Sequence, residues 1–281
     1  MNITKLFFTI AVTIWIVTHA IPAYADEVVR LESATVKPSP FQERKAREQG
    51  KSPPQSQAMP LLGYLSRPQG DGPFPAIVVM HGCGGIRPST KIDWPKRLVS
   101  WSYVVLVVDS FTTRNIKDTC QGYLADRVFD AYGALDFLST YSVVDAKRIA
   151  LMGFSAGGIA TLEATKAEGN EQFMDHKFKA AVAYYPVCAP NAGDATVPTL
   201  ILNGELDDWS PAEKCRQRVS RLSGKGPPIE LDIYPGAYHD FDSPEFTVGK
   251  RAFGHREEYN AAAAEQSFSS VKAFLYRYLS N

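Results

Sequence analysis

A serine flanked by small residues lies near the middle of the chain, at residues 153–158 (G-F-S-A-G-G). The apolar segment before it, 148–152, is typical of a buried strand, and residues 159–165 after it are typical of a helix start. A G-x-S-x-G motif between a strand and a helix forms a sharp turn with the serine at its apex. Glycine tolerates the backbone angles of such a turn. This context predicts that Ser155 is a nucleophile.

A serine hydroxyl needs a base within hydrogen-bond reach, and the base needs a carboxylate that fixes its tautomer. Where the serine lies on such a turn, the chain order is serine, acid, histidine. His239 follows a predicted strand at 229–234 and is the expected base. His255 lies among charged residues, which is typical of exposed surface, and His176 precedes every candidate acid.

Three carboxylates, Glu205, Asp207 and Asp208, follow the predicted strand at 197–202. We prefer Asp207 as the acid, because the spacing G-x-x-D before a helix that begins near Pro211 is where this chain order places it. Asp208 is the alternative. Either carboxylate could instead cap the helix that follows.

An oxyanion hole for the developing negative charge needs two N–H groups. The Ala156 N–H, directly after the serine, is the first. The loop H-G-C-G-G, which begins at His81 after a buried apolar run, would supply the second. We assign it to the Cys83 N–H, with that of Gly84 as the alternative. His81 is interpreted as a residue that shapes this loop and not as a base.

Aromatic residues in loops near the predicted strand ends are candidates for lining an apolar substrate pocket, although such residues also serve as plain packing: Phe111, Tyr123, Trp209 and Tyr238. The sequence contains no C-x-x-C motif, so the cysteine spacing does not support a zinc site. We expect no metal.

Predicted strands and helices alternate along the chain, which indicates a mostly parallel sheet with helices on both faces. Ligands in such sheets bind beyond the carboxyl ends of the strands. Residues 37–57 are polar and rich in proline, and we expect a solvated loop or flexible arm there. Residues 26–281 are expected to form one α/β domain. The strands are expected at 27–36, 60–67, 74–80, 103–108, 148–152, 178–185, 197–202 and 229–234.

The chain has 281 residues, 45% of them hydrophobic, and a formal net charge of zero. Balanced charge argues against nucleic acid or an anionic membrane surface as the main partner. Residues 1–25 have a lysine at position 5, an apolar run at 6–17 and the sequence A-Y-A at 23–25, which is typical of a signal peptide. The alternative is an uncleaved anchor, but the run is short for a span of about 20 residues. We expect a bacterial protein that is exported to the periplasm or secreted.

Export to an oxidising compartment changes how the four cysteines are interpreted, because an even number there favours disulfides. We favour a bond between Cys188 and Cys215, since each lies just beyond a predicted strand end on the same side of the sheet. Cys83 and Cys120 would form the second bond. Four unpaired thiols are the alternative.

In combination, these motifs resemble the dienelactone hydrolase family of α/β-hydrolases over about residues 57–279. The segments that carry the resemblance are P-F-P-A at 73–76, H-G-C-G-G at 81–85, the G-x-S-x-G turn, G-x-x-D at 204–207 and Y-P-G-A-Y-H at 234–239. The resemblance implies an eight-stranded sheet with its first strand absent or at an edge. It also implies no cofactor and hydrolysis of small esters or lactones.

The chain departs from the family's namesake at two positions. Dienelactone hydrolase proper uses a cysteine nucleophile, where this chain has Ser155, and a glutamate near that cysteine, where the matching position of this chain is Gly82. We therefore expect a serine esterase with an acyl-enzyme intermediate. The alternatives are a non-catalytic binding protein on the same fold and an acyltransferase with the same triad. The sequence specifies neither the substrate's acyl and alcohol groups nor an oligomeric state.

Overall fold

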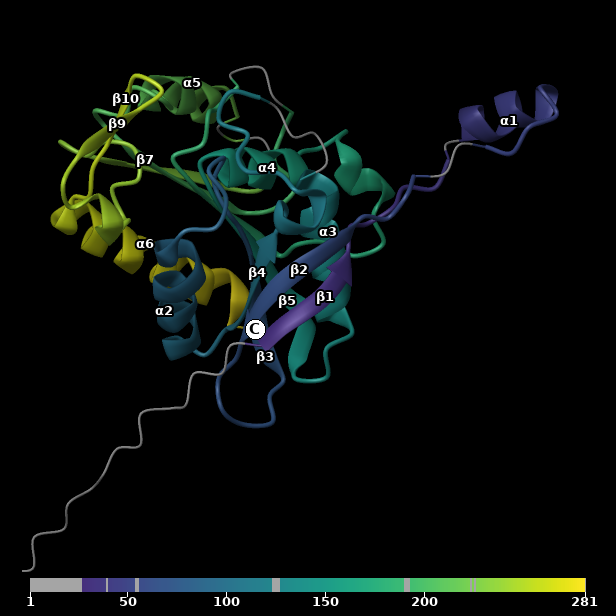
Figure 1. Ribbon diagram of the computed structural model, residues 1–281, viewed down its shortest axis with the longest axis horizontal. Coiled ribbons are helices and arrows are strands. Elements are labelled where there is room, and N and C mark those ends of the chain that lie inside the picture. The colour runs from purple at the N-terminus through teal and green to yellow at the C-terminus, as the bar shows by residue number, and fades with distance from the viewer. Residues whose placement is uncertain are drawn as a thin grey trace, which may run out of the picture.

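The computed structural model describes residues 27–280 except 39, 54–55, 123–126, 190–192, 223 and 225. The expected signal peptide, residues 1–25, lies outside the described residues. Within them, an eight-stranded sheet runs through the middle of the molecule in the order β1-β2-β4-β3-β5-β6-β7-β8 (Figure 1). Its strands are β1 Glu27–Glu32, β2 Pro60–Ser66, β3 Phe74–Met80, β4 Val104–Asp109, β5 Val144–Phe154, β6 Ala180–Tyr184, β7 Thr199–Gly204 and β8 Ile229–Tyr234.

The six strands from β4 to β8 in this order are parallel, whereas β1 and β2 form an antiparallel edge. The apolar runs of β3 and β4 are buried because helices cover both faces of the sheet there. The expected mostly parallel sheet of about eight strands is confirmed. Its parallel strands end at one edge, where the serine, acid and histidine loops meet.

Helices form a layer on each face of the sheet (Figure 1). On one face, α2 and α6 pack against Ile77, Val79 and their neighbours, and on the other α3 packs against Val78 and Met80. Successive side chains of a strand point to opposite faces, so one apolar run serves both cores. The main helices are α1 Pro40–Glu48, α2 Trp94–Ser100, α3 Arg127–Ser139, α4 Ala156–Ala164, α5 Ala212–Leu222 and α6 Ala261–Leu279. Among the described residues, none of these helices is long and apolar enough to span a membrane.

The structure differs from the sequence expectation at the polar segment 37–57, which contains helix α1 and not only loop. Its residues include good helix formers (Gln, Glu, Arg, Lys and Ala) after a proline at the first position, where proline is tolerated. Polar composition indicates exposure but does not exclude a helix. Figure 1 shows α1 well away from the sheet and the other helices.

A short hairpin, β9 Lys250–Ala252 and β10 His255–Glu257, follows the last parallel strand and was not expected from the sequence. Its two strands are only three residues each and mostly polar, so they lack the alternating pattern that marks a half-buried strand. Phe253 and Gly254 form the turn with φ angles of 52° and 89°. The largest shifts among the expected strands are the end of β1 and the start of β5, at Val144, each four residues earlier than expected. The bounds of β2, β4, β6 and β7 differ by one or two residues.

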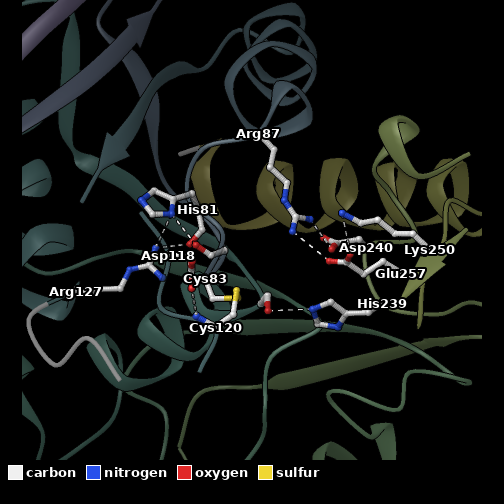
Figure 2. The surroundings of a disulfide bond; sticks show 12 residues. His81, Cys83, Arg87, Asp118, Cys120, Arg127, His239, Asp240, Lys250 and Glu257 are labelled. Atoms are coloured by element: carbon white, nitrogen blue, oxygen red, sulfur yellow. Dashed lines mark hydrogen bonds and ion pairs between the residues drawn. A yellow bond between two sulfur atoms is a disulfide. The ribbon is translucent and has the colours of Figure 1, made fainter. Parts of the chain in front are cut away.

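Two disulfides join the cysteines that the sequence analysis paired. Cys188, beyond the end of β6, is bonded to Cys215 in α5. Cys83, in the loop after β3, is bonded to Cys120, in a loop after β4, with 4.8 Å between the two Cα atoms (Figure 2). The second bond therefore tethers the loop that carries the candidate oxyanion donor.

Candidate active site

Ser155 lies between β5 and α4 with φ 50° and ψ −114°, a backbone conformation that few non-glycine residues adopt. A methyl group placed on Gly157 would lie 2.2 Å from the Met80 carbonyl oxygen, so only glycine allows the turn to pack this closely on the end of β3. The Ser155 N–H donates to the Tyr184 carbonyl oxygen at 3.0 Å. Contacts on both sides thus hold the strained turn and direct the serine side chain out of the sheet.

The structure brings Ser155, His239 and Asp207 together in one hydrogen-bonded chain. The Nε2 atom of His239 lies 3.0 Å from Ser155 Oγ, and its Nδ1 atom lies 2.8 Å from Asp207 Oδ2. Both His239 and Asp207 are buried. The proton on Nδ1 therefore faces the carboxylate, which leaves Nε2 free to accept the serine proton.

Asp207, and not Asp208, is the carboxylate that faces the histidine. Its other oxygen, Oδ1, accepts hydrogen bonds from the backbone N–H groups of Trp209 and Ser210, at 2.9 and 2.8 Å. These two bonds fix the carboxylate on the loop after β7. The Asp208 side chain is half exposed and turns the other way, where its Oδ1 atom accepts from the Arg256 N–H.

The electrostatic surroundings of His239 favour its charged form. Burial alone would lower its pKa, but Asp207 first, and then Asp240 and Glu257, raise the pKa above its usual value. The imidazole ring also packs against the Tyr185 ring, with ring centres 4.6 Å apart. An imidazolium that forms during a reaction would therefore be stabilised by nearby carboxylates.

The two candidate oxyanion donors lie on either side of the serine. Ala156 is the first residue of α4, so its N–H is at the positive end of a helix. The loop that contains Cys83 passes close to the serine, since a methyl group on Gly82 would lie 3.7 Å from Ser155 Cβ. Cys83 lines the same pocket as the serine, and its carbonyl oxygen accepts from the Thr119 N–H at 2.9 Å.

His81 is fully buried beneath this loop and holds its shape. Its Nδ1 atom lies 2.7 Å from the Gly82 carbonyl oxygen, and its Nε2 atom accepts from the Ser110 N–H at 3.3 Å. Burial and the neighbouring Arg127 guanidinium lower the pKa of His81 to about 3, so the ring is neutral near pH 7. Arg127 also donates to the His81 carbonyl oxygen (Figure 2).

The pocket beside Ser155 is small, about 20 Å³, and aromatic residues line it together with charged and polar ones. Of the four aromatic candidates, Trp209 lines it. Phe111 lies behind the loop, with its ring against His81, and the Tyr238 ring packs under the Arg256 guanidinium. Tyr123 lies outside the described residues. The other lining residues are Gly82, Cys83, Arg87, Ser89, Thr90, Phe154, Tyr185, His239, Asp240, Ser243 and Glu257.

Several residues of this pocket were not expected from the sequence, above all Arg87, Asp240 and Glu257. Asp240 could have been noticed as the neighbour of the histidine, but Arg87 and Glu257 carry no local signal. His255 is also closer to the site than expected, since its ring stacks on Trp209 with ring centres 5.0 Å apart. In the described part of the chain, no group of three or more His, Cys, Asp or Glu side chains could hold a metal ion.

A mostly parallel sheet with a G-x-S-x-G turn after β5, and with later loops that bring an aspartate and a histidine to that serine, defines an α/β-hydrolase. The comparison with protein families makes the assignment more specific. The model of the dienelactone hydrolase family matches residues 61–279, so the chain belongs to that family. It is accordingly a carboxylic ester hydrolase.

The individual relatives share low sequence identity with this chain. The chain is 24% identical over 229 residues to a Bradyrhizobium sp protein named "Probable 2-oxo-3-(5-oxofuran-2-ylidene)propanoate lactonase", a match that covers 76% of this chain and 88% of that protein. The chain is also 30% identical over 157 residues to cutinase est1 of Thermobifida alba. That match covers 53% of this chain and 48% of the cutinase.

Among solved structures, the dienelactone hydrolase-like promiscuous phosphotriesterase P91 from metagenomic libraries has a similar fold. The TM-score is 0.68 at 19% sequence identity, and the match covers 90% of this chain and 99% of that chain. At this level of identity the similarity concerns the fold alone.

Proposed function

We propose that the protein hydrolyses esters or lactones of small molecules through an acyl-enzyme on Ser155. The observation that carries this proposal is the unbroken chain of contacts from Ser155 Oγ to His239 and on to Asp207, at 3.0 and 2.8 Å. Ser155, His239 and Cys83 line one pocket, so an ester carbonyl bound there would face the serine, the base and the candidate oxyanion donor together. The names of a lactonase and a cutinase among the relatives support this substrate class.

In this mechanism Ser155 Oγ attacks the ester carbonyl carbon while His239 Nε2 takes the serine proton. The N–H groups of Ala156 and Cys83 donate to the oxyanion of the tetrahedral intermediate. His239 then returns the proton to the leaving alcohol, and the acyl group remains on the serine. A water molecule, deprotonated by the same histidine, attacks the acyl carbon; the bond to Ser155 Oγ breaks, and His239 returns the proton to the serine as the acid product leaves. Asp207 holds the imidazole in the required tautomer throughout.

The experiment is turnover of a short p-nitrophenyl ester by wild type and by the Ser155→Ala variant. Loss of a triad member removes several orders of magnitude in rate, so we expect the variant to lose at least about 10³-fold in kcat. Circular dichroism should show that it remains folded. Wild-type turnover retained in the variant would contradict the assignment, and rates that rise with added acceptor alcohol would favour acyl transfer.

We also propose that the protein is exported. The signal-peptide pattern in residues 1–25 and the two disulfides support this, because disulfides persist in oxidising compartments. Protein isolated from its native host should begin at Asp26. An uncleaved N-terminus in the cytoplasm would contradict the proposal.

A further inference from the structure

Arg87 follows residues 81–85, the loop that contains the candidate oxyanion donor Cys83 and is called the oxyanion loop below. Its side chain lies in the wall of the Ser155 pocket. Its Nη1 atom donates to Asp240 Oδ2 at 2.6 Å, and its Nη2 atom donates to Glu257 Oε1 at 3.1 Å (Figure 2). Asp240 directly follows His239, and Glu257 is the last residue of β10. One guanidinium therefore joins the oxyanion loop to the histidine loop and to the hairpin. Asp240 lies 153 positions after Arg87 in sequence, and Glu257 lies 170 positions after it.

The guanidinium is held in place on two further sides. It lies over the Phe246 ring, 4.8 Å from the ring centre. A methyl group on Gly84 would lie 3.4 Å from Arg87 Nη2, so the guanidinium also lies against the backbone of the oxyanion loop. Because the guanidinium is planar and two of its nitrogens donate hydrogen bonds, it fixes the relative positions of the two carboxylates and also offsets their negative charge.

The two carboxylates that Arg87 contacts are buried. The exposed fractions of the Asp240 and Glu257 side chains are 8% and 1%, against 27% for Arg87. Lys250, which is half exposed, lies 3.2 Å from the other oxygen of Glu257. Removing one partner of a buried ion pair leaves an uncompensated charge, so the arrangement depends on Arg87.

Asp240 has a φ angle of 57°, in the left-handed region that non-glycine residues rarely adopt. Such a conformation persists when the surrounding structure holds it. The contact with Arg87 anchors its side chain, and the His239 carbonyl oxygen on its N-terminal side accepts from the Glu258 N–H at 3.1 Å. The orientation of the histidine thus depends on a neighbour that Arg87 holds.

We propose that Arg87 is a positioning residue for ester hydrolysis: through Asp240 and Glu257 it fixes the oxyanion loop relative to His239, so that the oxyanion donors and the base face the same carbonyl carbon. This inference rests on the proposed function. Both terminal nitrogens of Arg87 are engaged within the protein, so its role is to align the loops and not to bind a substrate carboxylate.

Arg87 also offsets negative charge near the base. Asp240 and Glu257 raise the pKa of His239, and Arg87, which contacts both carboxylates, should offset part of their effect on the histidine. Removing Arg87 should therefore raise the pKa of the histidine, and neutralising Glu257 should lower it. The side chains that surround His239 are Asp207, Asp240, Glu257, Tyr185 and Trp209, with Arg87 and Lys250 behind the carboxylates and His255 behind Trp209.

The test measures kcat and KM against pH, with a short p-nitrophenyl ester, for Arg87→Met, Arg87→Lys and Glu257→Gln. We expect Arg87→Met to lower kcat about 10- to 100-fold with little change in KM, because the loops are displaced. The acid limb of kcat/KM, which reports the pKa of the free base, should move up by about one pH unit. Glu257→Gln should move it down, and Arg87→Lys should recover part of kcat.

Arg148→Met is the matched control. Arg148 also joins three segments, through Asp145 and the carbonyl oxygens of Pro73 and Leu279, but it lies at the opposite end of β5 from the serine. We expect the control to lower thermal stability without moving the acid limb. A shift equal to that of Arg87→Met would contradict a specific role for Arg87.

The outcomes distinguish failure of the proposed ester hydrolysis from failure of the positioning role of Arg87. A folded wild type without turnover overturns the proposed function. An active wild type, with the acid limb and kcat unchanged in both Arg87 variants and in Glu257→Gln, overturns the inference alone. Shifts of the same sign in Arg87→Met and Glu257→Gln also overturn it. Should Arg87→Met fail to fold, Arg87→Lys and Glu257→Gln decide, and the His239 imidazole can be titrated directly by NMR in Ser155→Ala.

Discussion

At the scale of single residues, the orientation of one side chain decides which of two adjacent carboxylates can serve as the acid. Asp207 and Asp208 are equivalent in composition and nearly so in spacing. In the structure, two backbone N–H groups hold Asp207 toward His239, while Asp208 lies among Arg256 and His255 on the hairpin side. The sequence favoured Asp207 by spacing but could not exclude its neighbour.

This difference yields a direct prediction for the two neighbouring variants. Asp207→Asn should lower kcat about 10⁴-fold, because an amide in place of the carboxylate stabilises the wrong imidazole tautomer. Asp208→Asn should change kcat less than about threefold, since its side chain faces away from the histidine. The measurement is steady-state hydrolysis of the same p-nitrophenyl ester. Equal losses in the two variants would show that the acid is misassigned.

At the scale of secondary-structure elements, the Cys83–Cys120 bond fixes the oxyanion loop to a loop that follows β4. The Cys188–Cys215 bond instead ties the end of β6 to α5. Both bonds close loops of similar length, with separations of 37 and 27 residues. Their entropic contributions to stability should therefore be similar, whereas only the first directly restrains a candidate oxyanion donor.

Replacing each pair by serine separates these two effects. We expect each double variant to lose about 4 kcal/mol in the free energy of unfolding, measured by denaturant titration. The Cys83→Ser/Cys120→Ser variant should also lose about tenfold in kcat, because its oxyanion N–H is less well placed. The Cys188→Ser/Cys215→Ser variant is the control and should lose less. A larger loss of kcat in the control would contradict the assigned oxyanion loop.

The elements predicted correctly from the sequence are those whose residue pattern lies within one short stretch of the chain. The apolar runs of β3 and β4 and the G-x-S-x-G turn are each contained in a short window. The hairpin β9–β10 lacks such a signal because its strands are short and polar. Helix α1 was missed because a polar segment without an apolar face resembles a loop in composition.

The same distinction holds for the candidate site. Ser155 and His239 could be identified because their surroundings follow a known order of elements. Arg87 and Glu257 could not, since their contact joins positions 170 residues apart and depends on how three loops fold over one another. The absence of Phe111 and Tyr238 from the pocket lining was likewise not predictable, because their rings pack against His81 and Arg256, which lie far from them in sequence.

At the scale of the whole molecule, a buried carboxylate connects the active site to the helix layer on one face of the sheet. Asp242 accepts hydrogen bonds from Trp94 Nε1 at 2.8 Å and from the Tyr185 hydroxyl at 2.9 Å. Tyr185 in turn packs against His239. Burial is the main cause that raises the pKa of Asp242 to about 6, and the nearby Asp240 contributes.

This raised pKa predicts how stability depends on pH. The folded protein holds the Asp242 proton more tightly than the unfolded chain, so the contribution of this group is greatest at low pH. It should fall by about 3 kcal/mol as the pH rises from about 3 to about 7. Asp242→Asn has no such proton to lose. Its free energy of unfolding, relative to wild type, should therefore increase by about that amount over the same range.

The exposed carboxylate Asp71 provides the control for this experiment. Denaturant unfolding of Asp71→Asn over the same pH range gives the baseline for removing an exposed carboxylate. A difference between Asp242→Asn and wild type that stays constant with pH would show that Asp242 does not titrate as inferred.

The central claim is that Ser155 is the nucleophile, and covalent labelling tests it most directly. Wild type, Ser155→Ala and Asp208→Asn are treated with a fluorophosphonate, and the modified residue is located by mass spectrometry of the digested protein. We predict one adduct, on Ser155, in wild type and Asp208→Asn, and none in Ser155→Ala. A folded wild type that remains unlabelled, or an adduct on another residue, would contradict the account.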